Sequence, residues 1–212
     1  MSTKVPVSML GNRQDPDRAQ FRVPWFVAWI DGKPDYRVIA PGKIETAIKS
    51  NLCWLCGKPM NTLKAFVIGP MCAINRTSAE PPCHPGCAEY AVKVCPFMTK
   101  PAMRRNEKGL PADVDNPGGF MIKRNPGVAL VWKTYSFKVI SAYAGEDGIL
   151  FKLGEPHVLS FWTEGRPSTR QEIMDSIESG FPILAEMAEK QPGAMEALNK
   201  AYEAALALLP AA

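Results

Sequence analysis

The sequence predicts an α+β protein, and three observations support this class. Segments rich in aromatic and β-branched residues, separated by Gly and Pro turns, recur over residues 25–162. Apolar residues then recur at helical spacing over residues 170–209. Six cysteines lie between residues 53 and 95, in a spacing typical of metal sites. With 212 residues, 46% of them hydrophobic, the chain can bury a core, so a metal would be a local support.

The expected order of elements divides the chain into four parts. Residues 1–22 are polar and predict a flexible arm. Residues 23–98 hold an N-terminal β-hairpin and the cysteine-rich module, and residues 99–118 form a basic loop rich in Pro and Gly. Residues 119–212 predict an antiparallel β-meander followed by C-terminal helices. Residues 119–212 can share one hydrophobic core with the cysteine-rich module.

The hairpin is predicted from two strand-like runs, residues 25–30 and 36–39, which flank the turn sequence Asp-Gly-Lys-Pro at 31–34. A short helix is expected next, because four apolar residues recur at helical spacing after Pro41-Gly42. These residues are Ile44, Ala47, Ile48 and Leu52.

Inside the cysteine-rich module, residues 64–68 predict a strand, Gly69-Pro70 a turn, and residues 71–74 a second strand. Pro85 suits the first position of a helix, because its missing N–H would be unpaired there anyway, and residues 88–94 are predicted to be helical. Cys95-Pro96 ends this helix.

The meander is expected to use strands at residues 120–123, 128–140, 149–153 and 158–162, with turns at Gly145, Gly148 and Gly154. Thr169 and Glu172 form a capping box for a helix over 170–179 that we expect to stop at Gly180. Pro182 restarts a helix through residue 189, and Gln191-Pro192-Gly193 breaks it. The last helix carries an apolar stripe of Met195, Leu198, Tyr202, Ala205 and Leu209, typical of core packing or of a helix–helix contact.

The sharpest chemical signal is a pair of metal-ligand motifs. Zinc prefers four thiolate or imidazole ligands, supplied as two chelating pairs by tight turns. Cys53-x-x-Cys56, followed by Gly57, is the first pair, and His84-x-x-Cys87 is the preferred second pair. Cys83 remains open as an alternative ligand to His84. We therefore expect one structural Zn²⁺, with Cys72 and Cys95 as buried free thiols.

The ligand order over residues 50–97 resembles that of treble-clef zinc modules. More of the chain resembles a set of uncharacterised bacterial and phage proteins, in the sequences FVIGPMC at 66–72, EPPCH at 80–84, CPF at 95–97, NPG at 125–127 and STR at 168–170. These resemblances imply a zinc-binding, zinc-finger-like module. They imply no activity, because modules of this kind serve DNA, RNA and protein contacts alike.

The sequence favours a non-enzymatic protein, and no catalytic residue is predicted. A catalytic zinc keeps one position open, whereas four ligands are available here. The zinc deaminase pattern is absent, residues 62–76 contain no histidine that could act as a base, and there is no Gly-rich phosphate loop. His157 lies in a predicted turn, and Cys72 lacks an obvious activating base. A hydrolase or nuclease-like enzyme stays open as a further alternative.

Charge suggests two kinds of partner. Residues 1–154 hold 21 Lys and Arg against 12 Asp and Glu, whereas residues 155–212 hold 4 against 9. The first hypothesis is a protein partner, or a homodimer, bound through the C-terminal helices. The alternative is nucleic acid, bound by the basic side chains that follow the metal-site helix. These side chains are Lys100, Arg104, Arg105 and Lys108.

No apolar run reaches the length of a membrane span, and no secretory apolar region precedes the cysteines. We therefore expect no membrane association and a cytoplasmic location, in a bacterial or phage-infected cell if the resemblance holds.

Overall fold

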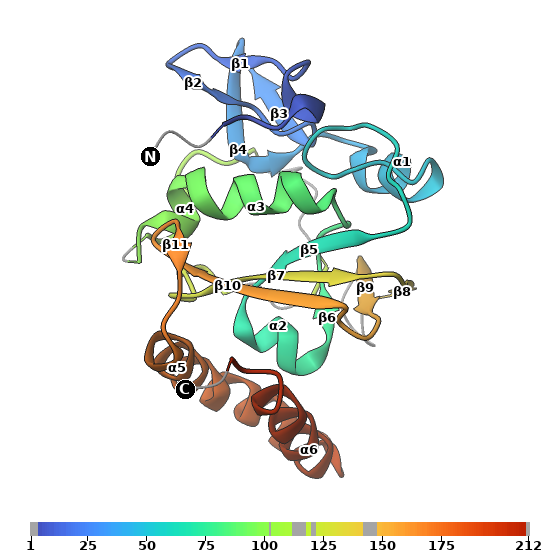
Figure 1. Ribbon diagram of the computed structural model, residues 1–212, viewed down its shortest axis with the longest axis vertical. Coiled ribbons are helices and arrows are strands. Elements are labelled where there is room, and N and C mark those ends of the chain that lie inside the picture. The colour runs from blue at the N-terminus through green and yellow to red at the C-terminus, as the bar shows by residue number, and fades with distance from the viewer. Residues whose placement is uncertain (1–3, 102, 112–117, 120–121, 142–147, 211–212) are drawn as a thin grey trace.

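The computed structural model describes residues 4–101, 103–111, 118–119, 122–141 and 148–210. The fold is α+β, as predicted, with N-terminal hairpins, antiparallel sheets and two C-terminal helices. Figure 1 shows the hairpins at one end of the molecule, a sheet in the middle and the C-terminal helices at the other end.

The N-terminal part contains five short elements, and the hairpin predicted for residues 25–39 is confirmed. They are a 3-10 helix, Val7–Met9, and strands β1 Gln14–Asp15, β2 Arg18–Arg22, β3 Val27–Ile30 and β4 Lys33–Ile39. Residues 4–22, which belong to the segment expected to be a flexible arm, contain the 3-10 helix and strands β1 and β2. Asn12 Nδ2 donates hydrogen bonds to the carbonyls of Val23 and Leu55, both at 2.9 Å, and Met9 is 2% exposed. The segment therefore contacts distant parts of the chain, such as Leu55.

The cysteine-rich module contains two strands and four helices. They are α1 Lys43–Lys49, β5 Lys64–Ile68, α2 Pro70–Asn75, β6 Thr77–Ser78, α3 Pro85–Val94 and α4 Pro96–Thr99. The prediction of a strand over residues 71–74 is wrong, because these residues belong to α2. Pro70 occupies the first helical position, and Ala73 and Ile74 on one side of the helix are buried.

The strands downstream belong to two separate antiparallel sheets. They are β7 Ala129–Thr134, β8 Phe137–Ser141, β9 Ile149–Leu153, β10 Val158–Thr163 and β11 Arg166–Pro167. The four-stranded sheet has the order β11-β10-β7-β5, and the three-stranded sheet has the order β6-β9-β8. The stretch expected to be continuous over 128–140 is interrupted at Tyr135-Ser136, where the Thr134 hydroxyl donates to the Ser136 and Glu155 carbonyls.

Some predictions in this region fall outside the described residues. Of the strand expected at 120–123, Phe120 and Met121 are not described, and Ile122 and Lys123 lie in no strand. The turn at Gly145 and the end of the basic loop at Pro117 also lie outside the described residues.

The two C-terminal helices are α5 Arg170–Glu189 and α6 Ala194–Leu206. The capping box is confirmed, since Thr169 and Glu172 each accept a hydrogen bond from the other's backbone N–H. The predicted stop at Gly180 is wrong, because α5 continues through Gly180 and Pro182. A Cβ atom at Gly180 would lie 2.8 Å from the Cγ and Sδ atoms of Met71. This glycine therefore allows α5 to lie close against α2.

Strands β5 and β7 of the four-stranded sheet have buried residues on both faces. Ala65 and Val131 point toward one cluster with α3, whereas Phe66, Leu130 and Trp132 point toward the other, with α2, α5 and α6. Figure 1 shows α3 on one side of this sheet and α2 with the C-terminal helices on the other. The predicted stripe of α6 packs into this second cluster, with Leu198 buried. The first cluster holds the cysteines and so positions the site.

Candidate metal centre

The first ligand pair lies on a tight turn between α1 and β5. The Cys53 N–H donates to the Lys58 carbonyl and the Gly57 N–H donates to the Cys53 carbonyl, both at 2.8 Å. Gly57 has a φ of 69°, which favours glycine, and a Cβ atom there would lie 2.4 Å from the Trp25 ring. This turn aims the thiols of Cys53 and Cys56 in one direction.

The second ligand pair lies at the start of α3, as predicted. His84 is the N-cap residue, Pro85 is the first helical residue and Cys87 lies in the first turn. The backbones of Ala65 and Cys83 exchange two hydrogen bonds, of 2.7 and 2.8 Å, immediately before His84. The short pairing of β5 with residue 83 thus takes the place of the hairpin that we expected at residues 64–74.

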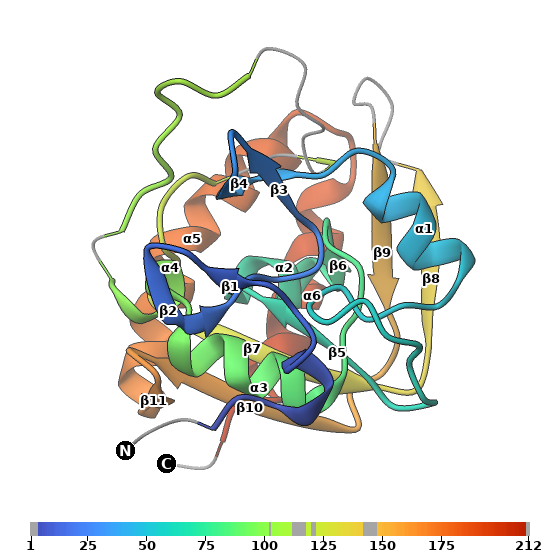
Figure 2. The same cartoon turned by 90° about the horizontal axis from the view of Figure 1, so that it is seen from above.

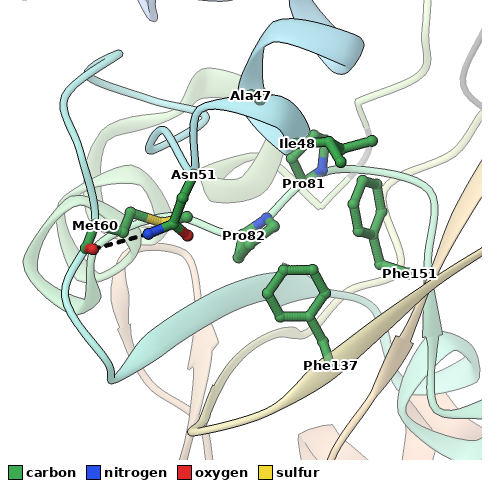
Figure 3. A pocket seen from close by; sticks show the side chains of 8 residues that line it. All are labelled: Ala47, Ile48, Asn51, Met60, Pro81, Pro82, Phe137 and Phe151. Carbon is green, nitrogen blue, oxygen red and sulfur yellow. Dashed lines mark hydrogen bonds between the residues drawn. The ribbon is translucent and has the colours of Figure 1, made fainter.

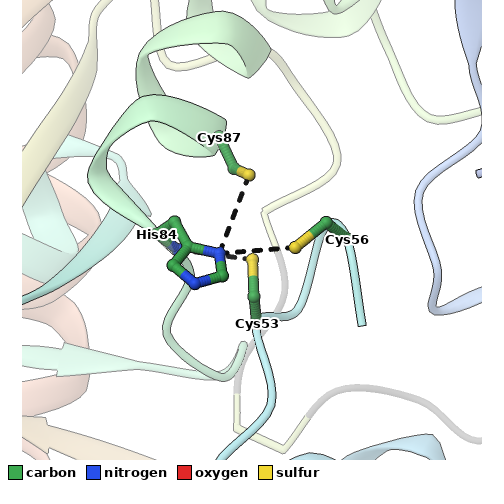
Figure 4. A group of neighbouring side chains, drawn as sticks. All are labelled: Cys53, Cys56, His84 and Cys87. Atoms are coloured by element: carbon green, nitrogen blue, oxygen red, sulfur yellow. Dashed lines mark hydrogen bonds between the residues drawn. The ribbon is translucent and has the colours of Figure 1, made fainter. Parts of the chain in front are cut away.

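The structure brings all four predicted ligands together, from the turn and from α3 (Figure 4). Their ligand atoms all lie within 4.8 Å of one another. His84 Nδ1 lies 3.3 Å from Cys56 Sγ and 4.0 Å from Cys87 Sγ. A tetrahedral zinc with ordinary Zn–S and Zn–N bonds requires separations of about 3.5 Å between such atoms. This Cys3His cluster could therefore hold one metal ion.

Hydrogen bonds around the cluster orient its members. The His84 Nε2–H donates to the Pro59 carbonyl at 3.0 Å, which leaves Nδ1 free to bind a metal. The His84 backbone N–H donates to Cys53 Sγ at 3.3 Å. Ser8, on the N-terminal 3-10 helix, is hydrogen-bonded to Cys87 Sγ at 3.1 Å. Sequence reasoning missed Ser8, because no local pattern links a serine near the N-terminus to a cysteine on α3.

The three thiols of the cluster share their protons unequally. The neighbouring thiols of Cys53 and Cys87 lower the pKa of Cys56 below its usual value. The same mutual contacts, led by Cys56 for Cys53 and by Cys53 for Cys87, raise the pKa of the other two thiols. Thiolates are the metal-binding form of cysteine, so metal binding would displace the protons that the thiols still carry.

The other three cysteines lie outside the cluster. The Cys83 thiol, 3% exposed, donates to the Ala65 carbonyl at 3.2 Å, so the geometry favours His84 over Cys83 as the fourth ligand. Cys72 and Cys95 are free and only partly buried. Burial raises the pKa of Cys72, which is the opposite of what a nucleophilic cysteine requires.

The basic loop is fixed to the hairpin of β3 and β4. Arg105 is half-buried and its Nη2 donates to the Arg37 carbonyl at 2.9 Å, while Arg37 Nη1 donates to the carbonyls of Asn106 and Lys108. The side chains of Lys100, Arg104 and Lys108 are exposed. Of the four predicted nucleic-acid contacts, three therefore face solvent and Arg105 holds the loop in place.

Comparison of the chain with protein-family models, with curated proteins and with solved structures gives no match. Within the described part of the chain, no helix has the length and apolar character needed to cross a membrane.

Proposed function

We propose that the protein is a non-enzymatic, zinc-stabilised binding protein that acts through protein–protein contacts. The observation that carries this proposal is the Cys3His cluster, whose four ligand atoms lie within 4.8 Å of one another. Four protein ligands complete a tetrahedral site, whereas a catalytic zinc leaves one position to water or substrate. The cluster thus has the composition of a structural site.

The donor set fits zinc better than the harder cations. Three thiolates and one imidazole suit Zn²⁺, while Mg²⁺ and Ca²⁺ prefer oxygen ligands. A bound zinc would supply a cross-link between the turn and α3. The residues that would hold it are Cys53, Cys56, Cys87 and, through Nδ1, His84.

The position of the cluster supports a scaffolding role. Cys53 is fully buried, and its neighbour Trp54 stacks on Phe26 of the hairpin region at a centroid distance of 4.5 Å. Ser8 ties the N-terminal 3-10 helix to Cys87. The cluster therefore joins the N-terminal hairpins to α3, and α3 packs on the central sheet. A protein organised in this way presents fixed surfaces to a partner.

Affinity capture with the intact chain at low and at high salt tests the proposal. We expect a protein partner that stays bound at about 1 M NaCl, because apolar contacts are screened little. The Cys87→Ser variant, which loses a ligand, should no longer retain it. Capture of nucleic acid that is released by salt or by nuclease treatment would instead support the basic loop as the binding surface and overturn the proposal.

A further inference from the structure

The outer strand of the three-stranded sheet is β8. In the order β6-β9-β8, its only neighbour among the described residues is β9. Figure 2 shows β8 at the margin of the molecule, on the side of β9 away from β6. An outer strand offers unpaired N–H and C=O groups to any extended segment that lies beside it.

The register shows which groups face outward. The Gly154 N–H donates to the Ser136 carbonyl at 3.0 Å, just before β8 begins. In an antiparallel pair, hydrogen-bonded and non-hydrogen-bonded positions alternate. Lys138 and Ile140 therefore bond to β9, and the backbone groups of Phe137, Val139 and Ser141 face the open edge.

A small apolar pocket adjoins this edge (Figure 3). Phe137 of β8 and Phe151 of β9 form one wall, and Ile48 and Pro82 lie across from them. The pocket leaves about 20 Å³ of room for a water-sized probe, enough for about one water molecule. Val139, on the same face of the strand as Phe137, is 44% exposed. Phe137 and Val139 thus offer an apolar surface, and no room for an inserted side chain, to a neighbouring strand.

The opposite face of the same edge carries an unfavourable charge pair. Lys138 lies directly across from Lys152, and both side chains are exposed. Like charges at directly opposed positions destabilise a sheet. Lys152 is partly compensated, because its Nζ donates to the Asn75 carbonyl at the end of α2. A carboxylate placed beside Lys138 would offset the repulsion.

This charge distribution discriminates between possible occupants. In a second copy of β8 paired antiparallel about Val139, Ile140 would lie across from Lys138, and a parallel copy would add another lysine there. Neither arrangement supplies a carboxylate. A partner segment with an acidic residue between two apolar residues supplies the charge on one face and places apolar side chains beside Phe137 and Val139 on the other.

We propose that β8 docks an extended segment of a partner protein, which adds a strand to the sheet and carries an acidic residue flanked by two apolar ones. This inference rests on the proposed function, because it names the surface and the chemistry of the protein contact. Strand addition takes its affinity from main-chain hydrogen bonds and its specificity from pockets for alternate side chains.

Selection from a phage-displayed library of random heptapeptides on the intact chain tests the inference. We expect enriched peptides with the pattern apolar-acidic-apolar, and Val139→Pro should weaken their binding at least about tenfold by removing an outward N–H. Proline is tolerated on an edge strand, so this variant should fold. Peptides enriched on Lys138→Glu should carry a basic residue in place of the acidic one. Val158→Ala, at an equally exposed valine of β10, is the control and should bind as the wild type does.

Two results would overturn the inference: no enrichment of the pattern, or enriched peptides that bind Val139→Pro and wild type equally. Neither result touches the proposed function, since a partner could still be captured on another surface. If Cys87→Ser binds the enriched peptides as well as the wild type does, β8 is still identified as the docking edge. That result would contradict only the role of zinc in the proposed function.

Discussion

Ser8 Oγ lies 3.1 Å from Cys87 Sγ, so the N-terminal 3-10 helix is hydrogen-bonded to a member of the Cys3His cluster. Outer hydrogen-bond partners of metal ligands orient them and tune their affinity. Ser8→Ala should therefore weaken metal affinity by roughly tenfold or more. Competition with a chromophoric zinc chelator measures this change.

Val7 provides a control for this prediction, because it lies in the same 3-10 helix and is 76% exposed. Val7→Ala should leave metal affinity unchanged. Equal affinities for Ser8→Ala and the wild type would show that the Ser8 hydroxyl does not contribute to metal affinity.

Metal content should separate the cysteines of the cluster from Cys83 and Cys95. We expect one zinc per chain in the wild type, and its loss in Cys53→Ser, Cys56→Ser, Cys87→Ser and His84→Ala. Cys83→Ser and Cys95→Ser should keep the metal, because the Cys83 thiol points to the Ala65 carbonyl and Cys95 lies outside the cluster. Elemental analysis of the purified variants checks both groups. Loss of zinc from Cys83→Ser together with its retention in His84→Ala would show that Cys83, and not His84, is the fourth ligand.

Asp15 should make stability depend on pH in the acid range. Burial raises its pKa, but hydrogen bonds from Tyr36, from the Asp17 N–H and from Arg18 outweigh burial and hold the pKa below its usual value. A lowered pKa in the folded state stabilises the protein above the unfolded pKa of about 4, and this stabilisation disappears as the pH falls through the folded pKa.

Asp15→Asn should thus lower the free energy of unfolding by about 1–3 kcal/mol at neutral pH. The difference from the wild type should shrink below about pH 4. Urea unfolding at several pH values gives the difference in the free energy of unfolding and its dependence on pH. Asp17→Asn is the control, because the Asp17 carboxylate is 64% exposed and pairs only with an exposed lysine, Lys33. A difference that persists unchanged at low pH would assign the effect to packing.

Gly180 should resist substitution even though it lies inside a helix. Alanine normally stabilises a helix interior by about 1 kcal/mol relative to glycine. Here the new Cβ would lie 2.8 Å from Met71 Cγ and Sδ, and overpacking costs about 1–3 kcal/mol. Gly180→Ala should therefore lower the melting temperature, whereas the same change in a Met71→Ala background should raise it. A double-mutant cycle measures the coupling, and additive effects would contradict the proposed contact.

The members of the Cys3His cluster could be predicted from the sequence because their spacing is typical of metal-ligand pairs. Cys53-x-x-Cys56 and His84-x-x-Cys87 each place two ligands on one turn, and neither pair needs knowledge of the rest of the chain. The hairpin of β3 and β4 and the capping box of α5 were predictable for the same reason.

The errors occurred where distant contacts decide the structure. Residues 71–74 are a short apolar run, which periodicity cannot assign to helix or strand, and packing against α5 and α6 favours the helix. Gly180 resembles a helix stop until its contact with Met71 is known. The N-terminal residues are polar, and their hydrogen bonds to Leu55 and Cys87 join positions too far apart in the sequence to be predicted.

The closeness of the ligand pairs along the chain has a consequence for the order of folding. Cys56 and His84 are 28 positions apart, whereas β5 must wait for β7, more than sixty residues later, to form the central sheet. Closing a shorter loop costs less entropy and precedes the pairing of distant strands. During synthesis, the part of the chain with the Cys3His cluster can thus assemble while β7 is still being made. Zinc availability at that stage, more than the stability of the finished protein, would then set the yield of folded chains, and pulse-labelling of cells with and without a zinc chelator would show it.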